Sequence, residues 1–257
     1  MEAQRLSALH GWLWIKQGYA LFMKAPLLWI VLLMICLAAA IGLSVLPVVG
    51  EPLLTLLMPA GMIGLMYGCR MLERGEELEL AHLFSGFQRQ TANLIALGGI
   101  SLVSQFLIFG LMMLAGGAAL VNILMSGQPD TDPAVLMEAF TGAGLSVLIG
   151  IALFSLLTMA MQYAPMLVFF NSAPPVAAMQ LSVSAFIRNI VPMLVYVVTY
   201  LFLAILASLP MFLGWLVLLP LTFTSLYASY RDIFPLVEEK PAEPPKDDPF
   251  VPGKDTF

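Results

Sequence analysis

The sequence is poor in charge and in the residues on which enzymes most often depend. Asp, Glu, Lys and Arg make up only 11% of the 257 residues, and there are two histidines and two cysteines. Neither His10 nor His82 has a second histidine or cysteine at metal-ligand spacing. Nucleophile-elbow, P-loop, HExxH and dinucleotide-binding motifs are absent. The sequence therefore predicts a protein with no catalytic centre, no cofactor and no metal ion, and we expect that it is not an enzyme.

Two ion-binding alternatives stay open at this point. Any enzymatic or cation-binding site would have to use acidic side chains of the loops after the first and third apolar runs, which are Glu51, Asp130, Asp132 and Glu138. Soft ligands for Cu(I) would have to come from a methionine stripe at helical spacing, which consists of Met58, Met62 and Met66. Solvation of the acids and core or lipid contact of the methionines are the interpretations that we favour.

Apolar residues are abundant, at 60% of the chain. They form six runs, at about 26–46, 53–72, 94–121, 143–170, 190–208 and from the turn at Pro210 to about 230. A run of about 20 apolar residues is long enough to cross a bilayer as a helix. We therefore expect an all-α fold, a polytopic bundle of six transmembrane helices over residues 1–234. Residues 235–257, rich in proline and acids, are predicted to be a disordered cytoplasmic tail.

A short pattern opens the first, third and fifth runs. In each case a phenylalanine stands two residues before a cation, and the three cations are Lys24, Arg89 and Arg188. A helix-starting residue follows each of them. Recurrence at three equivalent places indicates three helical-hairpin repeats, each with an amphipathic helix before its outgoing span. Because cations and aromatic side chains suit the surface of an anionic membrane, we expect these three cations to form a lipid-binding collar.

Three prolines lie in the second, fourth and sixth runs and predict helix kinks. Pro59 stands eleven residues before Arg70, and Pro220 stands eleven residues before Arg231. Pro165 has no following arginine at that spacing. The match between the second and sixth runs favours the repeat, and the middle copy departs from it.

Residues 2–22 form the first of the amphipathic segments. Trp12, Ile15, Tyr19 and Phe22 recur at helical spacing. This predicts a helix in the membrane interface, where Trp12 and Trp14 would keep their indole N–H groups near the headgroups. The alternative is that this segment is simply the start of the first span.

Two amides lie within apolar runs at similar predicted depth. Gln105 is eleven residues into the third run and Gln162 is eight residues before the end of the fourth. We expect an interhelical hydrogen bond between them, which would fix helix rotation more than stability. The alternative is that each amide separately bonds a kinked backbone or a water molecule.

The distribution of positive charge sets the expected orientation. All eleven Lys and Arg residues fall in the N-terminal segment, the loops after the second and fourth runs, and the tail. The positive-inside rule then places both termini in the cytoplasm, and a bacterial inner membrane is the expected location. No ionisable side chain stands near the centre of a run, which argues against an ion-coupled carrier.

Two stretches carry a family resemblance. Residues 11–18, Gly-Trp-Leu-Trp-Ile-Lys-Gln-Gly, and residues 225–234, Ser-Leu-Tyr-Ala-Ser-Tyr-Arg-Asp-Ile-Phe, resemble an uncharacterised family of bacterial six-span inner-membrane proteins. The chain also faintly resembles the membrane domain attached to some glycerophosphodiester phosphodiesterases, without their soluble catalytic barrel. The resemblance implies a location and a fold, and it implies no chemistry.

These observations favour a non-catalytic membrane protein with a lipid-interacting or scaffolding role in envelope maintenance. Its expected partners are membrane lipids, anionic on the cytoplasmic side, and not nucleic acid; the sequence identifies no protein partner. The alternative is a carrier for a neutral or amphipathic small molecule, which would require a water-filled cavity between the returning spans. A solid core would favour the scaffold.

Overall fold

The computed structural model describes residues 3–117, 132, 134, 137, 141 and 143–235, and every regular element in these residues is helical. Asp130, Glu138 and the predicted disordered tail after residue 235 lie outside them. The elements are α1 (His10–Lys24), α2 (Pro26–Ser44), α3 (Gly50–Glu73), η1 (Leu80–Phe84), α4 (Ser85–Gln88), α5 (Thr91–Met112), the π-helix η2 (Met113–Gly117), α8 (Gly144–Asn171), α9 (Pro175–Arg188), α10 (Ile190–Ser208) and α11 (Trp215–Ile233).

Five helices are long and apolar enough to cross a membrane, where the sequence predicted six. They are Pro26–Ser44, Gly50–Glu73, Thr91–Ala115, Gly144–Asn171 and Ile190–Ser208. The sixth expected span exists as the helix α11, but its second half carries hydroxyls and the charged pair Arg231 and Asp232. These polar residues lower its hydropathy and give it partners inside the protein.

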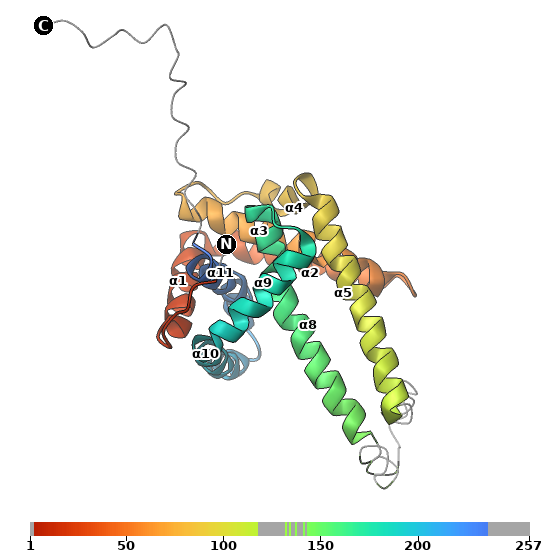
Figure 1. Cartoon of the computed structure of the whole chain (residues 1–257). Helices are drawn as coiled ribbons and strands as arrows, with labels where there is room; N and C mark the ends of the chain where they lie inside the picture. Colours follow the sequence, from red (N-terminus) through yellow and green to blue (C-terminus); the bar gives the residue numbers. More distant parts are fainter. Residues whose placement is uncertain are drawn as a thin grey trace, which may run out of the picture.

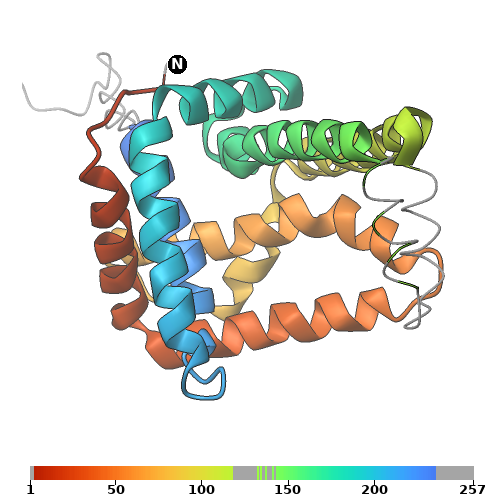
Figure 2. The same ribbon diagram turned by 90° about the horizontal axis from the view of Figure 1, so that it is seen from below.

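The long helices form three hairpins, α2–α3, α5–α8 and α10–α11, which point in different directions. Figure 1 shows α10 end-on and α5 and α8 from the side, whereas Figure 2 shows α10 along its length. This differs from the predicted six-helix bundle. The three hairpins share a buried core near their bases, and α3 also packs on α5 further out, where a Cβ added to Gly98 would lie 2.2 Å from the carbonyl oxygen of Leu56.

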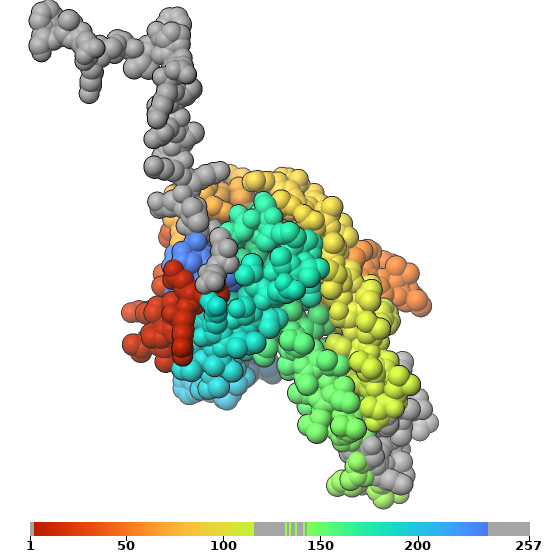
Figure 3. Space-filling model, viewed as in Figure 1, coloured from red at the N-terminus to blue at the C-terminus, as the bar shows by residue number. Residues whose placement is uncertain are grey.

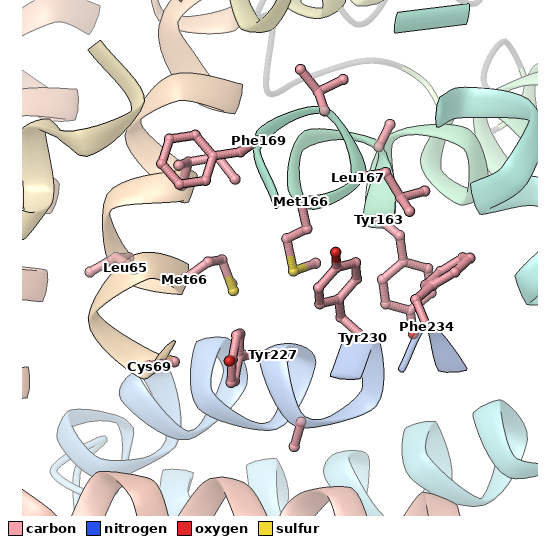
Figure 4. Packing of buried hydrophobic residues seen from close by; sticks show 14 of the residues in the cluster. Leu65, Met66, Cys69, Tyr163, Met166, Leu167, Phe169, Tyr227, Tyr230 and Phe234 are labelled. Atoms are coloured by element: carbon pink, nitrogen blue, oxygen red, sulfur yellow. The ribbon is translucent and has the colours of Figure 1, made fainter. Parts of the chain in front are cut away.

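That core, which we call the junction, is built mainly from the C-terminal halves of α3, α8 and α11. Met66, Met166, Tyr227 and Tyr230 are fully buried. Figure 4 shows these four side chains pointing into the space that the three helices share. Prolines stand inside all three helices, and the buried stretches lie around and after them. The returning helix of each hairpin therefore supplies the larger part of the junction.

The outer halves of the hairpins expose large apolar side chains. Phe106 on α5, Leu148 on α8 and Ile205 on α10 are 65%, 67% and 65% exposed. Figure 3 shows the outer ends of α5 and α8 projecting from the body of the molecule. Apolar surface of this extent is unfavourable in water. The hairpins are therefore suited to lipid.

A shorter helical segment precedes each hairpin and packs on the returning helix of another hairpin. A Cβ added to Gly64 of α3 would lie 2.4 Å from the carbonyl oxygen of Leu83, so η1 approaches α3 closely. On α8, the carbonyl of Met159 accepts a 2.6 Å hydrogen bond from Ser182 of α9. Helix α1, which precedes the first hairpin, packs on α11, the returning helix of the third. The hairpins thus share an arrangement, while the sequence repeat stays a prediction.

The prolines do not occupy three equivalent places. Pro59 and Pro220 lie 14 and 13 residues before the ends of α3 and α11, whereas Pro165 lies only six residues before the end of α8. All three are buried inside their helices. The kinks stay a prediction, and in the middle hairpin the proline lies nearer the helix end.

Helices α1, α10 and α11 together form what we call the third-hairpin layer, which lies across the end of α3. Gly11 of α1 lies against Pro192 near the start of α10. At the other end of α1, the Lys24 ammonium donates to the Leu72 carbonyl in the last turn of α3, at 2.6 Å. Figure 2 shows α1 and α10 running side by side, across the direction of α2 and α3.

Candidate functional site

Helix α1 is packed inside the protein more than the sequence suggested. Trp14 is 0% exposed, and its indole Nε1–H donates to Asp232 Oδ2 at 3.0 Å. Trp12 is 50% exposed. Only Trp12 therefore has the exposure that an interfacial role requires, and the headgroup position predicted for Trp14 is wrong. Because Asp232 lies 218 residues away in the sequence, no local pattern around Trp14 indicates this hydrogen bond.

A polar network ties α1, α3 and α11 together at the junction. The Arg231 guanidinium forms an ion pair with Glu73 and donates to Gln17 Oε1 at 3.0 Å. Glu73 also accepts a 2.8 Å hydrogen bond from the Tyr227 hydroxyl. Arg231 lies 3.8 Å from Asp232 as well. The network therefore connects α1 and α11, the first and last helices of the membrane domain, through α3.

Each of the three predicted collar cations has a contact within the protein. Lys24 bonds the Leu72 carbonyl as described, and the Arg89 guanidinium lies 5.9 Å from the centre of the Phe169 ring. Arg188 Nη1 donates to the Ala3 carbonyl at 3.2 Å. Lys24 and Arg89 thus meet the ends of α3 and α8, where positive charge is favourable.

The collar side chains nevertheless stay accessible. Lys24, Arg89 and Arg188 are all classed as exposed. Arg70 lies in the same region, and its guanidinium stands 5.0 Å from the centre of the Phe170 ring. Cations, aromatic rings and apolar helices therefore meet at one end of the hairpins.

The two predicted intramembrane amides lie on helices that pack together, α5 and α8. Gln105 Nε2 donates to Ser101 Oγ at 3.2 Å, one turn earlier on its own helix. This bond satisfies one N–H of the amide locally. The direct contact between Gln105 and Gln162 stays a prediction.

The remaining ion-binding candidates are dispersed. Glu51 is exposed at the start of α3, and Asp132 accepts a 2.9 Å bond from the backbone of Ala134. Within the described part of the chain, no group of three or more His, Cys, Asp or Glu side chains is placed to hold a metal ion. In the methionine stripe, Met58 is exposed and Met66 is buried. That stripe is therefore divided between the surface and the core.

A groove of about 410 Å³ lies between α1 and the third hairpin. One wall is the exposed face of α1, with Trp12, Lys16 and Tyr19 at helical spacing. The opposite wall is apolar and includes Leu203 and Ala207. Lys16 is the one charged residue of the lining. The sequence indicated the amphipathic face of α1 but not the groove, because the second wall comes from α10 and α11, at the other end of the chain.

Exposed apolar hairpins around a buried junction define this protein as an α-helical, multi-pass integral membrane protein. A curated relative from Burkholderia thailandensis, named a probable inner membrane protein, is 31% identical over 260 residues, covering 93% of this chain and 96% of the relative. The chain belongs to this family of bacterial inner-membrane proteins. No family model and no solved structure matches it. Nothing in the comparisons connects it with glycerophosphodiester phosphodiesterases, and the relative's name states no enzymatic activity.

Proposed function

We propose that this inner-membrane protein has no catalytic centre and that it binds anionic lipid at its cytoplasmic face, in a lipid-interacting or scaffolding role in envelope maintenance. The observation that carries the proposal is the meeting of exposed Lys24, Arg89 and Arg188 with the apolar hairpins at one end of the molecule. Such a surface attracts anionic headgroups, at about 1 kcal/mol for each cation.

The placement in the membrane follows from charge. In the described residues every Lys and Arg lies in or near the junction or on α1, and the outer turn that begins α3 carries the acid Glu51. The junction and both termini therefore belong to the cytoplasmic side. A reporter fused after Phe234 should be cytoplasmic, and an external signal would contradict this orientation.

Four crossings are supplied by α2–α3 and α5–α8 in this proposal. Although α10 is also long and apolar enough to cross, the third-hairpin layer lies across the end of α3, and we place it on the cytoplasmic side of the membrane with its exposed apolar side chains towards the hydrocarbon. The six-span topology expected from the sequence would require α10–α11 to cross as well. Both arrangements keep the two termini on one side.

A packed junction supports the scaffold over the carrier. Met66, Met166 and Tyr227 are fully buried where the returning helices meet, and this is the space that a solute pathway between those helices would need. A carrier would have to open this core, with the loss of its apolar packing. Solute-dependent opening of this core, detected by labelling of a cysteine placed at Met166, would favour the carrier.

The lipid proposal is tested by neutralising the collar. Replacing Lys24, Arg89 and Arg188 together by glutamine should lower the retention of phosphatidylglycerol by the purified protein, by about fivefold for each cation that holds a headgroup. A matched variant with Lys24→Arg, Arg89→Lys and Arg188→Lys keeps the charge and should retain the lipid. Native mass spectrometry of both variants measures this, and equal retention would refute the collar.

A further inference from the structure

We propose that the groove between α1 and the third hairpin is a binding site for one anionic phospholipid, with an acyl chain along its apolar wall and the phosphate at Lys16. This inference rests on the proposed lipid interaction and locates it at a site that the collar does not include. The occupant follows from the lining, which combines a long apolar surface with a single positive charge and no acid.

Lys16 differs from the other cations carried by the α-helices. Lys24, Arg70, Arg188 and Arg231 all contact groups of the protein. Within the described residues, Lys16 has no hydrogen bond, ion pair or ring contact, and its side chain is exposed. Its ammonium is therefore available to a phosphate, which a lysine binds as a point charge.

The aromatic residues beside Lys16 suit the same occupant. Trp12 stands four residues before it and Tyr19 three residues after it, so all three lie on one face of α1. Both rings line the groove, and each is about half exposed. Trp and Tyr side chains present an apolar ring and a polar edge, which matches the boundary between headgroup and acyl chain.

Two small residues of the apolar wall, Gly214 and Ala207, face each other where the third hairpin turns. A Cβ added to Gly214 would lie 2.5 Å from the Cα of Ala207, so α10 and α11 approach closely there. Leu203 and Val217 continue the wall on either side. A volume of about 410 Å³ is within the range of small-molecule sites.

The depth of the groove fits a headgroup at Lys16. Trp14 bonds Asp232 at the end of α11, and Lys24 bonds the Leu72 carbonyl at the end of α3. Lys16 lies between these two anchored positions on α1. Because the proposed placement puts the third-hairpin layer on the cytoplasmic side, the groove, which runs from Leu221 to the turn of the third hairpin, lies at the level of the cytoplasmic headgroups.

The test uses the full chain in detergent, titrated with phosphatidylglycerol or with phosphatidylcholine of the same acyl chains and followed by native mass spectrometry. Lys16→Gln should weaken phosphatidylglycerol binding about fivefold and leave phosphatidylcholine unchanged, whereas Lys16→Arg should bind as the wild type. Arg74→Gln is the control, because it removes an exposed cation that does not line the groove. Equal losses in Lys16→Gln and Arg74→Gln would overturn the site.

Filling the groove gives an independent arm. Ala207→Phe should lower the binding of both lipids, because the ring occupies the apolar wall that the acyl chain needs. If that variant does not elute as a folded protein, Val217→Phe at an exposed lining position replaces it. Unchanged binding of both lipids in the folded filling variant would refute the site.

The outcomes also separate this inference from the proposed function. A wild-type protein with no preference for phosphatidylglycerol would refute both. A preference that falls in the triple collar variant and persists in Lys16→Gln would refute the groove alone.

Discussion

The close packing of α1 on α11 predicts opposite effects of one substitution at two glycines. A Cβ built on Gly18 would lie 2.6 and 2.7 Å from the backbone N and Cα of Ser225. Carbon atoms in contact normally stand about 3.5–4.0 Å apart, so Gly18→Ala must push the two helices apart by roughly 1 Å. A Cβ on Gly61 of α3 meets nothing within 4 Å. Gly61→Ala is therefore the matched control.

The magnitude follows from two terms. Both substitutions gain about 1 kcal/mol of helix propensity, since glycine is the less favourable residue inside a helix. Only Gly18→Ala also overpacks a contact, at a cost of about 1–3 kcal/mol, because backbone atoms cannot rotate away. Gly61→Ala should raise the free energy of unfolding, and Gly18→Ala should lie about 1–3 kcal/mol below it. For a chain of this size, that gap corresponds to roughly 2–12 °C in Tm.

Thermal unfolding of the two variants and the wild type in one detergent measures the gap, with circular dichroism as the signal. The buried indole of Trp14 gives a second signal that reports the docking of α1. Equal Tm values for Gly18→Ala and Gly61→Ala would refute the docking, because a helix lying free in the interface has no neighbour for the added methyl group to meet.

Three further predictions address other parts of the molecule. A cysteine placed at Met211, in the turn of the third hairpin, should be inaccessible to an impermeant thiol reagent added outside the cell if the layer has the proposed cytoplasmic position; external labelling would favour the six-span topology instead. Trp14→Phe should lower the free energy of unfolding by roughly 1.5–3 kcal/mol, through loss of the indole bond to a carboxylate, and an unchanged denaturation midpoint would contradict that bond. If Gln105 and Gln162 pair directly, a double-mutant cycle to leucine should give a coupling of about 0.6 kcal/mol, and additive effects would show that each amide is satisfied separately.

The hydropathy pattern predicted the long helices well, because a membrane-compatible helix needs a continuous apolar run and little else. The fifth predicted run, 190–208, coincides with α10, and the first begins at Pro26 as α2 does. Proline at the first turn of a helix marks a start without loss of a hydrogen bond. The inner-membrane location is confirmed by the relative from Burkholderia thailandensis, and the all-α class is confirmed for the described residues by the structure.

The relations between helices were not accessible from the sequence. An amphipathic face predicts burial on one side of α1, but lipid and protein satisfy such a face equally, and the structure assigns it to α10 and α11. The ion pair of Glu73 with Arg231 joins residues 158 positions apart. The groove likewise needs two walls from distant segments. The composition of a helix predicts whether it is compatible with lipid, whereas the helices that it packs against depend on the three-dimensional structure.

The third-hairpin layer has a mechanical consequence for the bilayer that holds it. In the proposed placement, α1, α10 and α11 occupy area in the cytoplasmic leaflet only, while α2–α3 and α5–α8 pass through both leaflets. An unequal area between the two leaflets bends a bilayer, with the fuller leaflet on the convex side, and the affinity of inserted helices depends on that curvature. In that placement the protein is a one-sided wedge, and its energy in the membrane depends on how strongly the surrounding bilayer is curved.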